Sequence, residues 1–126
     1  MKKIPFTSIS QDWRTPRNVY DGLDAEFGFR FDPCPNHSLI DGLSIEWQSP
    51  AYVNPPFKDI AKWVSKAWNE HQNGKTVVLL IPARTDTRWW HDYCMKASEI
   101  RFIKGRLKYE GAKFNAPFPS CVVVFK

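Results

Sequence analysis

The residues best suited to chemistry form the run Asn54-Pro55-Pro56-Phe57. Its two prolines fix φ at about −65° and lack N–H groups, so a strand that reaches Asn54 must end there. The Asn54 side chain and the Pro55 carbonyl then offer two fixed hydrogen-bond acceptors beside the flat ring of Phe57. This arrangement suits a planar amine, for example the amino edge of adenine. The run is also an ordinary strand end with Phe57 in the core, so by itself it leaves both interpretations open.

The pattern of apolar residues predicts one α/β domain over residues 1–126, with an irregular arm at 1–14. Its periodicity predicts helices at 16–27, 58–72 and 87–97, and strands at 29–32, 51–53, 76–81, 99–103, 106–109 and 120–125. Thr15 is expected to cap the first helix, with Pro16 at its first position. Strands that alternate with helices favour a mostly parallel sheet, closed here by an antiparallel C-terminal strand.

Three of the predicted strands are expected to end along one edge of this sheet. That edge would gather Asp32, the run that begins at Asn54, and Arg84. In open α/β sheets, ligands bind beyond the carboxyl ends of the strands. The sequence therefore predicts a binding crevice at this edge.

Composition narrows the classes of function. A formal net charge of +5 leans toward polyanionic partners, although many soluble domains of similar charge bind no nucleic acid. The scattered Cys34, Cys94 and Cys121 favour a reducing cytosol over a disulfide framework. The histidines lack metal-ligand spacing, so no metal is expected. Neither a signal peptide nor an apolar run of membrane-spanning length is recognisable, so a cytoplasmic protein away from the membrane is expected.

A series of short motifs extends over nearly the whole chain. The motifs are Trp13-Arg14-Thr15-Pro16, Glu26-Phe27-Gly28-Phe29, Asp32-Pro33-Cys34, Asp41-Gly42-Leu43, Trp47, Asn54-Pro55-Pro56-Phe57, Trp63-Val64, and the segments 80–87, 105–109 and 117–120. In this order they resemble the small phage and prophage DNA adenine-N6 methyltransferases of the Dam type. The resemblance implies a reduced Rossmann-like methyltransferase fold, S-adenosylmethionine as methyl donor, DNA as partner, and the cytoplasm of a bacterial host.

The resemblance also implies a role for each residue of the first motif. Asn54 and Pro55 would accept both hydrogens of the adenine amine and orient its lone pair for in-line attack, without a covalent enzyme intermediate. Pro56 would hold the shape of the loop. Phe57 would stack on a base that has left the duplex.

Donor-side roles follow from the same resemblance, and each has a plain structural alternative. The residues assigned to the donor are Trp13, Thr15, Pro16, Asp32, Pro33, Cys34 and Asp41. Asp32 would favour the cationic end of the donor, or simply end a strand. Asp41 would bind ribose hydroxyls, or only form a turn. Thr15 would bind the methionine carboxylate, or only cap a helix, and Trp13 would pack on the donor's adenine or cover the core.

Basic residues in the second half of the chain are candidates for phosphate contacts. They are Arg84, Arg88, Lys104, Arg106 and Lys113, and two tryptophans lie among them. Arg84 and Arg106 are the preferred pair. The alternative is that the tryptophans belong to the core and that the isolated cations have no specific role.

The segment that follows Asp32 is unusually short for a donor site. It has no glycine until Gly42, and only 22 positions separate Asp32 from Asn54. A full set of crossover units cannot fit there. The protein then either binds the donor weakly, or another chain, such as a second copy, completes the donor site. Two alternatives to DNA adenine methylation stay open: a non-catalytic nucleic-acid-binding relic, or methylation of another planar nitrogen in cytosine, RNA or protein glutamine.

Overall fold

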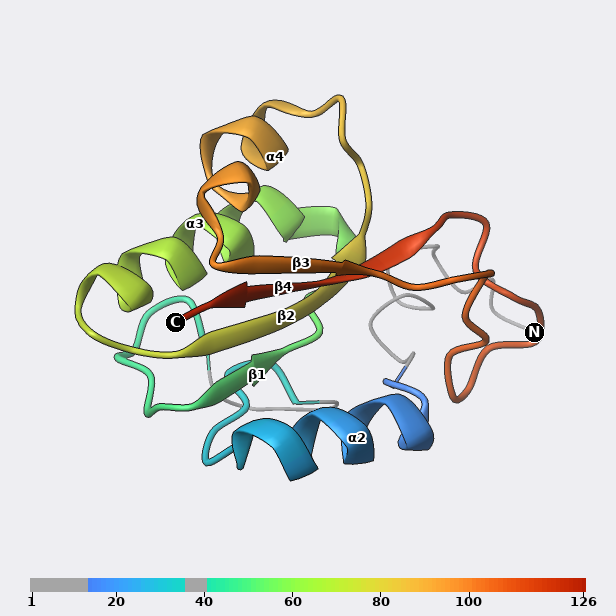
Figure 1. The fold of residues 1–126 in the computed structure, drawn as a ribbon, viewed down its shortest axis with the longest axis horizontal. Helices are drawn as coiled ribbons and strands as arrows, with labels where there is room; N and C mark the ends of the chain where they lie inside the picture. The colour runs from blue at the N-terminus through green and yellow to red at the C-terminus, as the bar shows by residue number, and fades with distance from the viewer. Residues whose placement is uncertain (1–13, 36–40) are drawn as a thin grey trace.

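A four-stranded sheet with helices on both faces forms this protein (Figure 1). The computed structural model describes residues 14–35 and 41–126. Helix α2 (Arg17–Phe27) packs on one face of the sheet. Helices α3 (Ile60–Gln72) and α4 (Arg88–Asp92) pack on the other face. The chain is therefore a small mixed α/β domain, as the periodicity predicted.

The sheet is mixed rather than mostly parallel. Its strands are β1 (Ala51–Val53), β2 (Val77–Pro82), β3 (Glu99–Phe102) and β4 (Ser120–Phe125), in the order β1-β2-β4-β3. Strands β1 and β2 pair in parallel, whereas β4 pairs antiparallel with both β2 and β3. The predicted antiparallel C-terminal strand is thus confirmed. It lies inside the sheet, however, so two of the three strand pairings are antiparallel.

The strand predicted at 29–32 is reduced to a single parallel bridge between Phe31 and Ala51. Two hydrogen bonds accompany this bridge, from Arg30 N to Pro50 O and from Tyr52 N to Phe31 O, each 2.9 Å long. Pro33 follows almost at once, and a proline cannot donate to a further rung of the ladder. The segment therefore lies beside β1 without forming a strand of its own.

Two predicted helix starts differ in their capping. Pro16, not Thr15, is the N-cap of α2, and it makes no side-chain cap hydrogen bond. Thr87 caps α4, because its hydroxyl accepts a hydrogen bond of 3.3 Å from Trp90 N. The helix predicted over 87–97 is split into α4 and a 3₁₀ turn at Cys94–Lys96.

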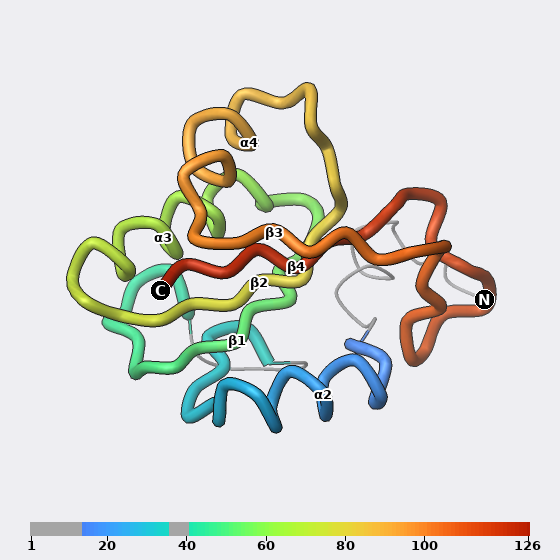
Figure 2. Tube along the Cα trace, viewed as in Figure 1, coloured from blue at the N-terminus to red at the C-terminus, as the bar shows by residue number. Residues whose placement is uncertain are grey.

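The prediction of a strand at 106–109 is wrong. Residues 103–119 form a long connection between β3 and β4 that projects beyond the end of the sheet (Figure 2). Within it, Ala116 N donates to Leu107 O over 2.7 Å, and Glu110 forms an isolated antiparallel bridge with Arg14. These isolated contacts satisfy backbone groups that a strand would have used in a ladder.

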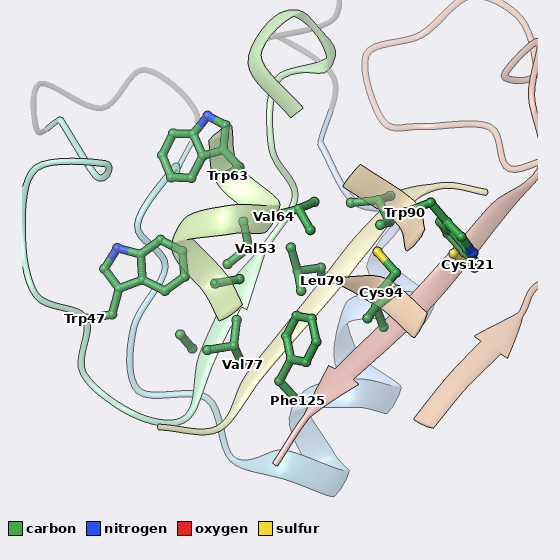
Figure 3. Packing of buried hydrophobic residues seen from close by; sticks show 14 residues of the cluster. Trp47, Val53, Trp63, Val64, Val77, Leu79, Trp90, Cys94, Cys121 and Phe125 are labelled. Carbon is green, nitrogen blue, oxygen red and sulfur yellow. The ribbon is translucent and has the colours of Figure 1, made fainter. Parts of the chain in front are cut away.

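The core is divided between the two faces of the sheet. Alternate residues of β2 face opposite sides, so Leu79 packs toward α3 while Leu80 packs toward α2. The α3 side also buries Trp47, Trp63 and Trp90 (Figure 3). Within the described ranges, no helix combines the length and the apolar character that crossing a bilayer requires.

Candidate active site

The structure brings the loop after Phe31 into contact with the loop after β1. The Cys34 thiol donates a hydrogen bond to the main-chain carbonyl of Asn54, with 3.5 Å between Sγ and O. Cys34 N in turn donates to Asp32 Oδ1 over 3.0 Å. Because Phe31 is bridged to Ala51 one strand length earlier, the two loops leave the sheet side by side. We call this meeting point the Asp32–Asn54 junction.

The Asn54 loop has the stiff geometry that its prolines predict. Strand β1 ends at Val53, and Pro56 is extended with φ −63° and ψ 140°. A 3₁₀ turn at Phe57–Asp59 then leads into α3. The predicted order of strand, rigid loop and helix is confirmed.

Phe57 is anchored from one side by aromatic rings of the 103–119 connection. Its ring meets Phe118 edge-to-face with centroids 5.0 Å apart, and Tyr109 at 6.4 Å. Phe57 itself is only half-buried, whereas Phe118 and Tyr109 are buried. The Arg84 guanidinium lies 5.7 Å from the centre of the Phe118 ring. Arg84 is therefore one ring away from Phe57, near the site as expected.

Asp32 is an electrostatically unusual carboxylate at the junction. Desolvation by the surrounding protein raises its pKa to about 6, and the hydrogen bond from Cys34 N only partly opposes this effect. By surface area, however, Asp32 is an exposed residue, so its carboxylate has lost only part of its hydration. Within the described part of the chain, no Lys, Arg or His forms an ion pair with it. A cationic ligand would therefore find here an anion that has lost part of its hydration.

Cys34 and Pro33, the two other residues of this loop with an expected donor role, make structural contacts. Burial raises the pKa of the Cys34 thiol far above the physiological range, so Cys34 stays protonated and acts as a hydrogen-bond donor. Pro33 is buried, and its carbonyl lies against Gly42.

Tyr52 lies beside the Asp32–Asn54 junction, and sequence reasoning did not single it out. It lies in β1, is only 2% exposed, and its hydroxyl forms a short hydrogen bond with the Thr15 hydroxyl. Its pKa is raised, first by burial and more weakly by nearby charges that include Asp32. Thr15, placed beside Pro16 at the start of α2, is thus held close to the junction. The signal was present: a tyrosine inside a buried strand needs a partner for its hydroxyl.

Asp41 uses its carboxylate within its own turn. Oδ2 accepts from Ser44 Oγ over 2.6 Å and Oδ1 accepts from Leu43 N over 3.1 Å. The hydrogen bond from Ser44, followed by that from Leu43 N, lowers the pKa of this carboxyl. The turn interpretation therefore describes Asp41 as it stands, and ribose binding stays a prediction. Trp13 lies outside the described residues.

Gly42 lies in close contact with Pro33 and with Trp63 of α3. A Cβ at this position would lie 1.9 Å from Pro33 O and 2.9 Å from the Trp63 ring. Trp47 Nε1 donates to Gly42 O over 2.7 Å, and the rings of Trp47 and Trp63 stack at 6.3 Å. Only glycine allows the backbone to approach so closely.

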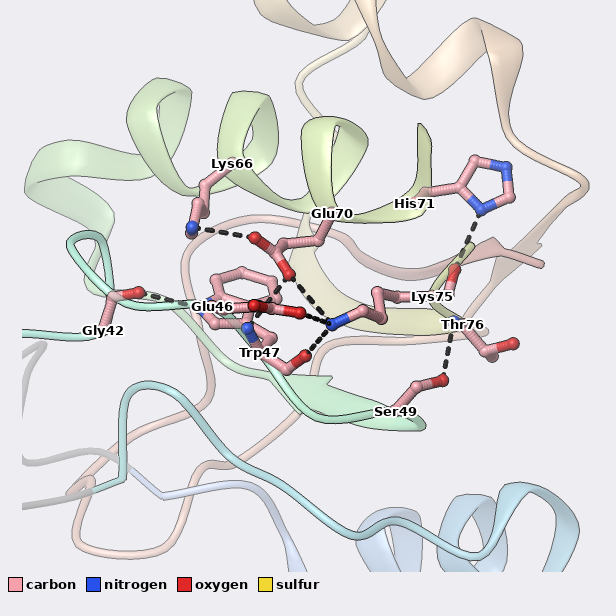
Figure 4. Close-up of polar contacts among 9 residues, drawn as sticks. All are labelled: Gly42, Glu46, Trp47, Ser49, Lys66, Glu70, His71, Lys75 and Thr76. Carbon is pink, nitrogen blue, oxygen red and sulfur yellow. Dashed lines mark hydrogen bonds and ion pairs between the residues drawn. The ribbon is translucent and has the colours of Figure 1, made fainter. Parts of the chain in front are cut away.

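A buried carboxylate at the far end of α3 completes this attachment (Figure 4). Glu70 is 5% exposed and accepts from Trp47 N over 3.0 Å and from Lys66 Nζ over 2.9 Å, with Lys75 Nζ at 3.6 Å. Desolvation acts to raise the pKa of Glu70, but these hydrogen bonds and the two lysine charges outweigh it and lower the pKa. The network is structural and holds residues 42–47 along the helix.

The predicted phosphate-contacting residues fall into two groups. Arg84, Lys104, Arg106 and Lys113 are exposed on connections at the edge where β2 ends and β4 begins. Arg88 is separate, because it lines an open groove of about 580 Å³ between α3 and α4. Its Nε lies 3.6 Å from Asp92 Oδ2 on the same helix. Of the two tryptophans, Trp90 belongs to the core.

Among residues 14–35 and 41–126, no three His, Cys, Asp or Glu side chains are grouped so that they could hold a metal ion.

Comparison with known proteins identifies the family. No curated protein matches the chain. A family model described as DNA N-6-adenine-methyltransferase (Dam) matches residues 6–121, which include every residue of the Asp32–Asn54 junction. The chain therefore belongs to the DNA N-6-adenine-methyltransferase (Dam) family.

Proposed function

We propose that this protein transfers a methyl group from S-adenosylmethionine to the N6 amine of adenine in DNA, at the Asp32–Asn54 junction. The observation that supports the proposal is the contact of Cys34 with Asn54, because it brings Asp32, which we assign to the donor, close to the Asn54 loop, which we assign to the acceptor. Membership of the Dam family supports the same substrate.

On the acceptor side, the chain supplies orientation and electrostatics. The adenine amine is a weak nucleophile because its lone pair is delocalised into the ring. Asn54 Oδ1 and the Pro55 carbonyl accept its two hydrogens and turn the lone pair out of the ring plane. Pro56 keeps the two acceptors in register, and the half-buried Phe57 offers its ring to a base that has left the duplex.

On the donor side, the residues fit a cationic ligand. S-adenosylmethionine, when bound, supplies an electrophilic methyl group on a positively charged sulfur. Asp32 offers a partly desolvated carboxylate, and the Thr15 hydroxyl is held nearby by Tyr52. Pro33 and Cys34 keep the backbone of this loop close to Asn54.

The remaining features of the proposal concern architecture. Residues 1–126 form one minimal methyltransferase domain of reduced Rossmann-like type, in which the parallel pair β1–β2 and the bridge at Phe31 are the remnant of the larger parallel sheet. The donor site, built on a short segment, is completed by a second copy or another chain if the isolated protein binds the donor weakly.

The decisive experiment identifies the methylated nucleoside. The purified protein is incubated with labelled S-adenosylmethionine and, separately, with mixed DNA and mixed RNA, which are then digested to nucleosides. We expect label in N6-methyladenine from DNA. Label in N4-methylcytosine or in RNA would redirect the proposal to that substrate. No label, together with no heat of donor binding at millimolar concentration, would identify a nucleic-acid-binding relic.

A further inference from the structure

Phe114 is the most exposed of the large apolar side chains in the described residues. Its exposed fraction is 73%, compared with 66% for Phe102 and 59% for Met95. It lies in the 103–119 connection between β3 and β4. A phenylalanine in such a position gives up the stabilisation that burial of its ring would provide. Single exposed apolar residues are common on protein surfaces, so a binding role for Phe114 has to be argued from what surrounds its ring.

The connection presents Phe114 on a built support. Ala112 and Ala116, two residues away on either side, are both buried. Ala112 N donates to Tyr109 O over 3.0 Å, and Ala116 N donates to Leu107 O over 2.7 Å. The flanking backbone is thus fixed to the core, and the residues between these alanines are carried outward by it.

The charge around Phe114 selects a polyanion as the partner. Four exposed cations lie in the same connection, and none forms an ion pair with the described residues: Lys104, Arg106, Lys108 and Lys113. Lys113 Nζ lies 5.7 Å from the centre of the Phe114 ring. The one acidic residue of the connection, Glu110, accepts a hydrogen bond of 2.8 Å from Arg17 N. An apolar ring among unneutralised cations suits stacked bases between phosphates.

The 103–119 connection also packs against Phe57, the ring proposed to stack on the base. Tyr109 and Phe118, on either side of Phe114 in sequence, both pack their rings against Phe57. A duplex that delivers a base to Phe57 therefore lies against the 103–119 connection. An extruded base leaves a gap in the stack, and a flat apolar side chain can fill it.

We propose that Phe114 enters the base stack of duplex DNA and fills the place of the extruded adenine. This inference rests on the proposed function and adds a positioning residue to it. Phe114 acts on the duplex and not on the reacting amine. Its loss should therefore impair duplex substrates and leave substrates that need no extrusion unaffected.

The test compares Phe114→Ala with Phe102→Ala, which replaces a similarly exposed phenylalanine on edge strand β3. Methyl transfer is measured on an intact duplex and on single-stranded DNA of the same sequence. We expect Phe114→Ala to lower the rate on the duplex by about 5-fold to 100-fold, the effect of losing one aromatic stacking contact. The rate on single strands should stay within about twofold of wild type, since no stack is opened there. Phe102→Ala should match wild type on both.

A binding measurement separates this inference from the proposed function. Fluorescence anisotropy compares an intact duplex with one that carries a central abasic nucleotide, a ready-made gap. Wild type and Phe102→Ala should prefer the gapped duplex, and Phe114→Ala should lose that preference. The binding measurement needs no methyl transfer. A wild type without methyltransferase activity would therefore contradict the proposed function but would leave this binding test valid. Equal preferences in wild type and Phe114→Ala, or equal losses on duplex and single strand, would overturn the role of Phe114.

Discussion

The Cys34 thiol donates a hydrogen bond to the main-chain carbonyl of Asn54 across 3.5 Å. The contact joins two loops that are 20 residues apart in sequence. Because burial keeps the thiol protonated, the donor is present throughout the physiological pH range. The bond holds the peptide plane between Asn54 and Pro55, and with it the direction in which the next carbonyl points. Cys34 thus helps to align the loop that carries Asn54.

Replacement of Asn54 by alanine should abolish most methyl transfer without unfolding the protein. The change removes the side-chain acceptor but keeps the main-chain carbonyl to which Cys34 donates. We expect the rate to fall by about 100-fold or more, the usual effect of losing one preorganised hydrogen-bonding group. Transfer of labelled methyl groups measures the effect, and thermal melting checks the fold. Asn69→Ala, at an exposed position of α3, is the control. Equal rates in the two variants would remove Asn54 from the mechanism.

Donor binding should strengthen as the pH rises through about 6. Desolvation raises the pKa of Asp32 to about 6, so the carboxyl is neutral below that pH and anionic above it. A cationic ligand binds the anion better, and affinity should rise between pH 5 and 7. In the free protein the sign is opposite: a raised carboxyl pKa means that the folded state binds the proton more tightly, so this group's contribution to stability falls as the pH rises toward 6.

Calorimetry at several pH values, with Asp32→Asn and Asp21→Asn, tests this behaviour. Asp32→Asn should bind the donor weakly and show no change in affinity across this range. Asp21→Asn, at an exposed position of α2, should keep the wild-type profile. A wild-type pH profile in Asp32→Asn would assign the titration to another group.

Gly42→Ala should destabilise the protein, whereas Gly22→Ala should stabilise it. The new Cβ at position 42 would meet the Pro33 backbone at 1.9 Å, and backbone cannot yield cheaply. We expect a loss of about 3 kcal/mol in the free energy of unfolding. Gly22 lies in α2 with nothing within 4 Å of its Cβ position, so alanine should add about 0.5–1 kcal/mol. Urea denaturation measures both, and a neutral Gly42→Ala would show that Gly42 does not pack against the Pro33 backbone in solution.

Arg84→Gln should weaken DNA binding, whereas Arg88→Gln should not. Arg84 lies over Phe118, which packs against Phe57, while Arg88 faces the groove between α3 and α4. Losing one phosphate contact should lower affinity for all sequences and reduce the slope of log affinity against log salt by about 1. Salt titrations of DNA binding followed by anisotropy measure the slope. Equal effects of both changes would place the DNA across α4.

The sequence predicted the elements whose signal is local. The helix ending at Phe27 and the buried run that begins at Val77 were found to within one residue, because periodicity and the flanking Gly and Pro define them. The pairing of the strands depends on contacts distant in sequence. Nothing local indicates that β4 pairs with both β2 and β3, or that Glu110 pairs with Arg14.

The candidate site was predictable where stiff backbone sets the geometry. Two prolines placed Asn54 at a strand end, and Pro33 limited the loop that reaches it. The role of Thr15 was not predictable, because a hydroxyl before Pro16 is equally suited to a cap or to a partner such as Tyr52. That choice is made by tertiary packing of α2 against β1.

Helix α3 links both halves of the proposed site. The Asn54 loop leads into its first turn, while residues 42–47 lie along it from Trp63 to Glu70. Under the proposed function, this helix of 13 residues would set the separation of methyl donor and methyl acceptor. Mutations that bend α3 would therefore displace the Asn54 loop and residues 42–47 together.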